Sequence, residues 1–150
     1  MRCHLIPRLL PFLLMSAWPL AACADTVVIV HPSNPVQSMT PREVSDLYLG
    51  RSRAFATGAQ TEPLPAFIYE YPADSPLREK FFRALNSMSI SKLNAYWARL
   101  RFSGEVLPPL ALADSSAVLD AVSHNQKAIG YVDASAVGDS SVKIVLRLKE

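Results

Sequence analysis

Cysteine and histidine are scarce in this 150-residue sequence, and their positions exclude several chemistries. Both cysteines, Cys3 and Cys23, fall within the first 24 residues, so the rest of the chain can form no disulfide and offers no thiol nucleophile. Beyond residue 24 the histidines are His31 and His124, and His31 has no paired Cys, Asp or Glu at metal-ligand spacing. We therefore interpret His31 as a turn residue and His124 as a helix-end residue, and we expect no metal site.

Catalytic motifs and an excess of charge are missing as well. The sequence contains no G-x-S-x-G, H-E-x-x-H, Walker or G-x-G-x-x-G pattern. Arg2 and Arg8 are the only charged residues before Asp25, so the remainder carries 13 basic and 13 acidic side chains. A neutral domain without a basic cluster does not hold nucleic acid by its phosphates. These absences favour a binding protein without a cofactor over an enzyme or a nucleic-acid-binding protein.

Residues 1–24 have the composition of a secretory signal peptide. Arg2 and Arg8 give a positive start, and residues 9–24 are uncharged. Pro11 and Pro19 interrupt this stretch, which is shorter than the roughly 20 apolar residues that a membrane span needs. We therefore predict an exported protein whose single domain is residues 25–150. Because disulfides are optional in a bacterial periplasm, a cysteine-free domain fits that location.

The end of this segment allows two ways of processing. An A-x-A site at residues 22–24 permits cleavage before Asp25, which would leave the protein free in the periplasm. Residues 20–23 (LAAC) also resemble a bacterial lipobox, which would leave Cys23 lipidated and attached to a membrane. A predicted strand starts at Thr26, which makes the tether of a lipid-anchored domain short. We therefore favour plain cleavage.

Strand and helix signals alternate along residues 25–150. Residues 26–30 form a continuous β-branched run, typical of a strand buried on both faces. The clearest helix starts at Thr40, where Pro41 and Glu43 complete a capping box with a first-turn proline, and it ends at Gly50. Further expected elements are strands at 64–69, 110–113, 128–132 and 142–148, helices starting at 75, 91 and 115, a polar loop at 51–63 and a C-cap at 125. This alternation predicts one α/β domain, a three-layer sandwich with a mainly parallel sheet.

Two of these helix starts are candidate anion sites. Ser38 and Thr40 precede the first helix, and Ser75 is the expected N-cap of the second. Free N–H groups and the positive end of the helix dipole favour a negative charge at such positions. Every helix needs a cap, so a purely structural role for Thr40 and Ser75 stays open. Asp74 would repel a fully ionised anion at the second start, unless it accepts a proton that the ligand still carries.

Several segments together resemble the periplasmic phosphate-binding proteins of ABC transporters. Residues 38–51 (SMTPREVSDLYLGR) are similar to the s-L-s-x-x-e-l-x-x-I-F-x-G segment of that family, and residues 128–132 (AIGYV) are similar to its A-I-G-Y-V strand. Residues 74–78 (DSPLR) stand where the family carries a Ser-Gly-Thr phosphate loop. The resemblance implies the type 2 periplasmic-binding-protein fold, and the length of this chain implies a single lobe of it.

The resemblance also implies that Ser75 contacts phosphate, with three departures around it. Pro76 and Leu77 replace the glycine and threonine of the family's loop, and Tyr71 stands near the expected arginine. Pro76 removes one N–H donor, and Leu77 removes a hydroxyl. Arg78, one helical turn further on, is the candidate counter-charge.

Two functions are therefore in view. The first is a periplasmic solute-binding protein that takes phosphate or another small anion weakly or within a complex, with an ABC permease as partner. Its candidate ligand residues are Ser38, Thr40, Ser75 and Arg78. The alternative is a non-transport interaction or sensor module that docks on an envelope protein, such as a sensor-kinase ectodomain, through the face that a second lobe would cover. Exposed aromatic residues on that face would favour docking, and a polar concavity would favour ligand binding.

Overall fold

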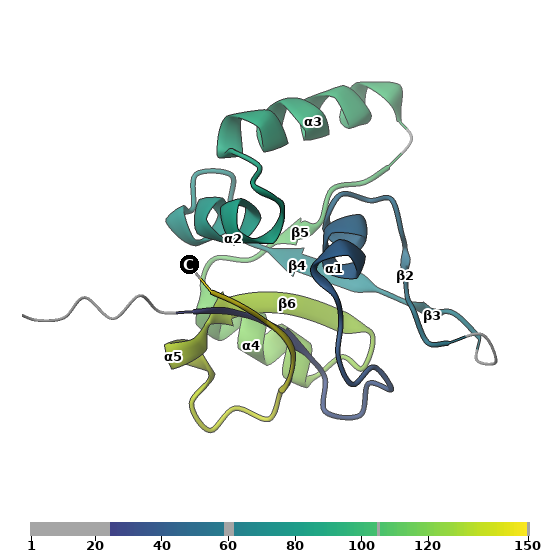
Figure 1. The fold of residues 1–150 in the computed structure, drawn as a ribbon, viewed down its shortest axis with the longest axis vertical. Coiled ribbons are helices and arrows are strands. Elements are labelled where there is room, and N and C mark those ends of the chain that lie inside the picture. The colour runs from purple at the N-terminus through teal and green to yellow at the C-terminus, as the bar shows by residue number, and fades with distance from the viewer. Residues whose placement is uncertain (1–24, 59–61, 105, 150) are drawn as a thin grey trace, which may run out of the picture.

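The computed structural model describes residues 25–58, 62–104 and 106–149, which form an open sheet with helices on both faces (Figure 1). The helices are α1 (Pro41–Tyr48), α2 (Pro76–Asn86), α3 (Ile90–Ser103), α4 (Ser115–Ser123) and α5 (Ala134–Val137). The strands are β1 (Thr26–Val30), β2 (Ala54–Phe55), β3 (Leu64–Pro65), β4 (Phe67–Glu70), β5 (Leu110–Ala111), β6 (Ala128–Asp133) and β7 (Lys143–Leu148). The predicted signal peptide and Cys23 lie outside the described residues. Within the described ranges, no helix has both the length and the apolar character that crossing a membrane requires.

The main sheet has five strands in the order β5-β4-β6-β1-β7. β4 pairs in parallel with β5 and β6, whereas β1 pairs antiparallel with β6 and β7. Only β1 therefore runs against the others, and the predicted mainly parallel α/β sheet is confirmed. Because β4, β5 and β6 run in one direction, their carboxyl ends meet at one edge of the sheet, which we call the carboxyl edge. β2 and β3 form a separate two-stranded ribbon.

The two faces of β6 show how the layers are packed (Figure 1). On one face Tyr131 stacks on Phe81 of α2 with ring centroids 3.7 Å apart, and Tyr48 of α1 packs edge-on against the Tyr131 ring. On the other face lies α4, and a Cβ at Gly130 would come within 2.6 Å of a Val118 methyl group. Glycine at this position therefore lets α4 approach the sheet closely. The result is the expected three-layer sandwich, with α1 and α2 on one face of the sheet and α4 on the other.

The strand expected at residues 64–69 is in fact two strands. Pro65 has no N–H to donate to a central ladder, so it cannot continue a strand inside the main sheet. Leu64 and Pro65 form β3 and pair with β2, which occupies part of the expected loop at 51–63. β4 then begins at Phe67 and enters the main sheet beside β6. The chain thus changes partners at the proline.

The end of α4 also differs from the prediction. The C-cap is His124, not Asn125, and its backbone is right-handed. Asn125 instead accepts a hydrogen bond at Oδ1 from the backbone N–H of Lys127, at 3.0 Å, in the turn that leads into β6. His31 behaves as expected of a turn residue, because its Nδ1 accepts a hydrogen bond from the N–H of Ser33.

Candidate functional site

A shallow depression of about 430 Å³ lies at the carboxyl edge, where the starts of α2 and α4 meet the ends of β4 and β6. Open α/β sheets bind ligands at this edge because helix N-termini converge there. The lining residues are mostly polar. They are Tyr71, Ser75, Pro76, Leu77, Lys80, Ala113, Asp114, Ser115 and Asp133.

Ser75 brings an open helix start into this depression. It is the N-cap of α2, and its side chain makes no capping hydrogen bond. Pro76 at N1 has no N–H, so the backbone donors at the start of the helix are those of Leu77 and Arg78. The Ser75 hydroxyl and these donors are the groups that a small anion could use.

Tyr71 and Ser115 join the depression from β4 and α4. The Tyr71 hydroxyl lies 3.1 Å from the carbonyl oxygen of Tyr131 and donates to it. Its single proton is then used, so the Ser115 hydroxyl, at 3.0 Å, donates to the Tyr71 oxygen. Burial raises the pKa of Tyr71, which keeps the phenol protonated and this chain of hydrogen bonds in place.

The charges that line the depression are mixed. Lys80 Nζ lies 3.1 Å from a carboxylate oxygen of Asp133. Asp114 caps α4 by accepting a hydrogen bond from the N–H of Ala117 at 2.9 Å. Among the described residues, one ammonium group and two carboxylates therefore line the depression, with Asp74 next to Ser75 in the chain. This set disfavours a fully ionised oxyanion and leaves acceptors for a proton that the ligand carries.

Arg78, the candidate counter-charge, lies elsewhere. Its side chain is buried, with the residue 3% exposed, and its Nε donates to Glu70 at 3.1 Å. A second guanidinium nitrogen donates to Asn94 Oδ1 at 2.9 Å, and the group lies over the ring of Phe82. Burial raises the pKa of Glu70, and the Arg78 charge opposes that rise. The guanidinium is committed to this buried pair, and the cation that lines the depression is Lys80.

Ser38 and Thr40 do not line the depression either. Both are exposed, and Thr40 forms the predicted capping box at the start of α1. The Thr40 N–H and hydroxyl donate to a Glu43 carboxylate oxygen at 2.7 and 2.8 Å. These bonds, the backbone one first, lower the pKa of Glu43, so a carboxylate of the protein itself occupies this helix start. The two candidate helix starts do not converge on one ligand.

Tyr71, Lys80, Asp114, Ser115 and Asp133 line the site but were not among the candidate ligand residues chosen from the sequence. Tyr71 follows β4, Ser115 follows β5 and Asp133 is the last residue of β6, and the carboxyl ends of these strands lie at the same edge of the sheet. The rule that ligands bind beyond the carboxyl ends of parallel strands would have indicated them. Among the described residues, no group of three His, Cys, Asp or Glu side chains is placed to hold a metal ion.

No family model matches the chain, and no curated protein sequence matches it. Solved structures do match its fold. A phosphate ABC transporter substrate-binding protein from Clostridium perfringens, solved with bound phosphate, superimposes with a TM-score of 0.62 and 20% identity over 81% of this chain. An ABC-type phosphate transport receptor from Vibrio cholerae superimposes with a TM-score of 0.62 and 19% identity over 81% of this chain. A protein from Planctomyces limnophilus described as a possible phosphate binding protein superimposes with a TM-score of 0.62 and 16% identity over 82% of this chain.

These likenesses establish the fold that the sequence resemblance implied. The chain spans 44%, 46% and 42% of the three matched proteins, so it corresponds to less than half of each. It therefore has the fold of one lobe of these proteins. The matched identity is low, so the ligand of this chain has to be argued from its own residues.

Proposed function

We propose that this protein is a solute-binding lobe that takes a small, partly protonated oxyanion, hydrogen phosphate or a close relative, at the carboxyl edge. The observation that carries the proposal is the open start of α2: the Ser75 side chain makes no capping hydrogen bond, and Ser75 and Leu77 line the depression. Neighbouring folds include a protein solved with bound phosphate, which supports the choice of ligand class. We propose binding without catalysis, in the periplasm, after export by residues 1–24.

The ligand should be held weakly by this lobe alone. A single lobe surrounds a ligand on one side, and the chain matches less than half of each two-lobed relative. Each charge-assisted hydrogen bond missing from the other side weakens binding by about 1.5–3 kcal/mol. We therefore propose that a partner, such as an ABC permease or another envelope protein, completes the site.

The charges favour a protonated oxyanion over a fully ionised one. Asp133 and Asp114 can accept a hydrogen bond from a P–OH group, whereas they repel an anion that has no proton to donate. Lys80, held by Asp133, contributes its charge at the same edge. Sulfate, which carries no proton at neutral pH, is the matched ligand that tests this argument.

The alternative function, docking through the carboxyl edge, finds less support in the residues there. Six of the nine described residues that line the depression carry a hydroxyl, ammonium or carboxylate group, which suits a polar ligand. Ile144 lies in β7, whereas four other large exposed apolar side chains, Phe67, Phe102, Leu107 and Leu110, belong to the start of β4, the end of α3 and the segment up to β5. A docking surface is therefore better sought there.

Isothermal titration with phosphate and with sulfate tests the proposed function. We expect a weak, saturable heat with phosphate near neutral pH, at least about tenfold weaker binding of sulfate, and a loss of the phosphate heat in Ser75→Ala. Ser38→Ala is the matched control, because that hydroxyl lies at the other helix start. Equal binding of the two anions, or phosphate binding that survives Ser75→Ala, would overturn the proposal, as would folded protein that gives no heat at millimolar phosphate.

A further inference from the structure

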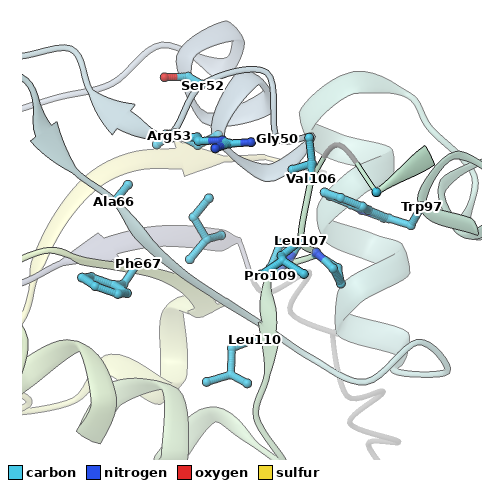
Figure 2. A pocket seen from close by; sticks show the side chains of 14 residues that line it. Gly50, Ser52, Arg53, Ala66, Phe67, Trp97, Val106, Leu107, Pro109 and Leu110 are labelled. Atoms are coloured by element: carbon cyan, nitrogen blue, oxygen red, sulfur yellow. The ribbon is translucent and has the colours of Figure 1, made fainter. Parts of the chain in front are cut away.

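A second depression, of about 550 Å³, lies on the side of β4 away from β6 (Figure 2). We call it the Trp97 groove. Its walls are the loop after α1, the first half of β4 and the segment that joins α3 to β5. Trp97 and Leu47 are buried among its lining residues, and Phe67, Leu107 and Leu110 form its exposed apolar margin. It shares no lining residue with the depression at the carboxyl edge.

Two prolines explain why this groove is open. β5 pairs with β4 only at Tyr69 and Glu70. The residues that would extend β5 alongside Phe67 are Pro108 and Pro109, which have no N–H to donate to a ladder. The ladder therefore stops at Leu110, and the segment before it lines the groove without continuing the strand.

The apolar residues around the groove are unusually exposed. Phe67 is 54% exposed, Leu107 89% and Leu110 61%. Phe102, in the last turn of α3, is 94% exposed and lies close in the chain to Gly104 and Val106, which line the groove. Scattered surface leucines are ordinary, but large apolar side chains gathered around one depression mark an interaction surface.

Basic side chains outnumber acidic ones among the described residues around the groove, where Asp46 is paired with Arg51. Glu105, between Gly104 and Val106 in the chain, lies outside the described residues. Arg53 is the charged residue among those described that line the groove, and it is exposed. α3 carries Lys92, Arg99 and Arg101 and no acidic residue. Arg101 is exposed and does not itself line the groove, but it is four residues after Trp97 and therefore on the same face of α3. A ligand that bears negative charge is therefore favoured.

The basic side chains also distinguish between two kinds of molecule that could occupy the groove, a second copy of this chain and a segment of another protein. A second copy related by a two-fold axis would place these arginines opposite their own counterparts, which costs association energy. An acidic segment with large apolar side chains complements both the arginines and the apolar floor. Its apolar residues would contact Trp97, Phe67 and Leu107, and its carboxylates would pair with Arg53 and Arg101.

We propose that the Trp97 groove binds an extended, acidic and apolar peptide segment of a partner protein. The groove volume, about 550 Å³, is within the range of sites that hold small ligands, and it suits one or two large side chains of such a segment. This binding is independent of the ligand at the carboxyl edge. It supplies the protein with a docking surface on another side of β4.

Trp97 provides a direct measurement of binding. In full-length protein carrying Trp18→Phe, Trp97 is the only tryptophan, so its fluorescence reports on the groove. The probe is the fluorescein-labelled, end-capped peptide Asp-Glu-Phe-Leu-Asp-Glu, followed by anisotropy as well as by tryptophan fluorescence. Matched peptides replace all four acids by lysine, or Phe and Leu by serine. We expect saturable binding of the first peptide and at least about tenfold weaker binding of the other two.

Variants of exposed residues distinguish the groove from the rest of the surface. Leu107→Ser and Arg53→Glu should each weaken the acidic peptide about tenfold or more, and Arg42→Glu, an exposed charge reversal on α1, should not. Equal binding of the acidic and lysine peptides, an Arg42→Glu effect as large as that of Arg53→Glu, or no change in anisotropy at millimolar protein would overturn the proposal. So would self-association that Leu107→Ser abolishes, because the occupant would then be a second copy. Phosphate should not compete with the peptide, which keeps this test separate from that of the carboxyl edge.

Discussion

The starts of α1 and α2 share a hydroxyl residue followed by proline, but only the start of α1 is closed by a side chain. Residues 40–43 (TPRE) and 75–78 (SPLR) both place a hydroxyl residue at the N-cap and proline at N1. At α1 the residue at N3, Glu43, folds back and accepts two hydrogen bonds from the N-cap. At α2 the residue at N3 is Arg78, which turns inward to Glu70. One start is closed by its own carboxylate, and the other faces solvent.

This difference shows that a capping sequence does not by itself report an anion site. The N-cap and the proline set the helix start in both cases, and the residue at N3 decides whether the donors remain available. At α2 that decision depends on tertiary packing, because Arg78 is drawn to a carboxylate in β4. The open start and the buried ion pair are thus two consequences of one side-chain position.

The largest expected effect comes from breaking the buried pair. Glu70→Ala leaves the Arg78 guanidinium buried without its carboxylate, which should reduce the free energy of unfolding by about 3–5 kcal/mol. Urea unfolding followed by circular dichroism measures the change. The double variant Glu70→Leu with Arg78→Met is the matched control, because it replaces both charges by apolar groups and should recover most of the loss. A single variant that loses less than about 1 kcal/mol would show that the pair does not hold α2 in place.

The next largest effect is a difference in unfolding free energy between variants of the two N-cap residues. Thr40→Ala removes a working N-cap and should cost about 1 kcal/mol of unfolding free energy. Ser75→Ala removes a hydroxyl that makes no capping bond. It should therefore lose only a small fraction of the unfolding free energy that Thr40→Ala loses. Thermal and urea unfolding of the two variants side by side give the comparison. Equal losses would mean that the Ser75 hydroxyl caps α2 in solution.

Local signals in the sequence were enough to predict the side-chain contacts at the start of α1, but not those at the start of α2. The capping box of α1 involves residues three apart, so Thr40 and Glu43 could be assigned without knowledge of the fold. The position of Arg78 depends on Glu70, eight residues earlier, and on Asn94, sixteen later in a different helix. Sequence spacing at one helical turn could not show that the guanidinium turns into the core.

The same limit applied to the carboxyl edge and to the Trp97 groove. Tyr71 and Ser115 are 44 residues apart and meet only because β4 and β5 are neighbours in the sheet. The alternation of strands and helices predicted the sheet itself, but not that β1 runs against the others, because that requires its pairing with β6 and β7. Pro108 and Pro109 were recognisable as a break in the chain, whereas the groove they open depends on their place beside β4.

A smaller effect follows from the pKa of Glu43. Hydrogen bonds from Thr40 lower that pKa below its ordinary value of 4.5, so the ionised carboxylate is bound more favourably in the folded protein than in the unfolded one. Its contribution to stability is present above pH 4.5 and is lost as the pH falls through the lowered pKa. Glu43→Gln should therefore be less stable than the unchanged protein at pH 7, and the difference in unfolding free energy should shrink as the pH falls below 4.5. A difference that persists undiminished at pH 3 would contradict this account.

The smallest change in stability should accompany Ser75→Asp, which gives α2 the closed start that α1 already has. A carboxylate at the N-cap can accept from the free backbone donors and is favoured by the helix dipole, but the neighbouring Asp74 and Asp114 oppose it. We expect a gain of only a few tenths of a kcal/mol in unfolding free energy, together with loss of the phosphate heat, because the protein's own carboxylate would fill the site. Ser38→Asp, beside the start that is already closed, should leave that heat unchanged. Phosphate binding that survives Ser75→Asp would place the ligand away from α2 and would remove the functional meaning of the difference between the two helices.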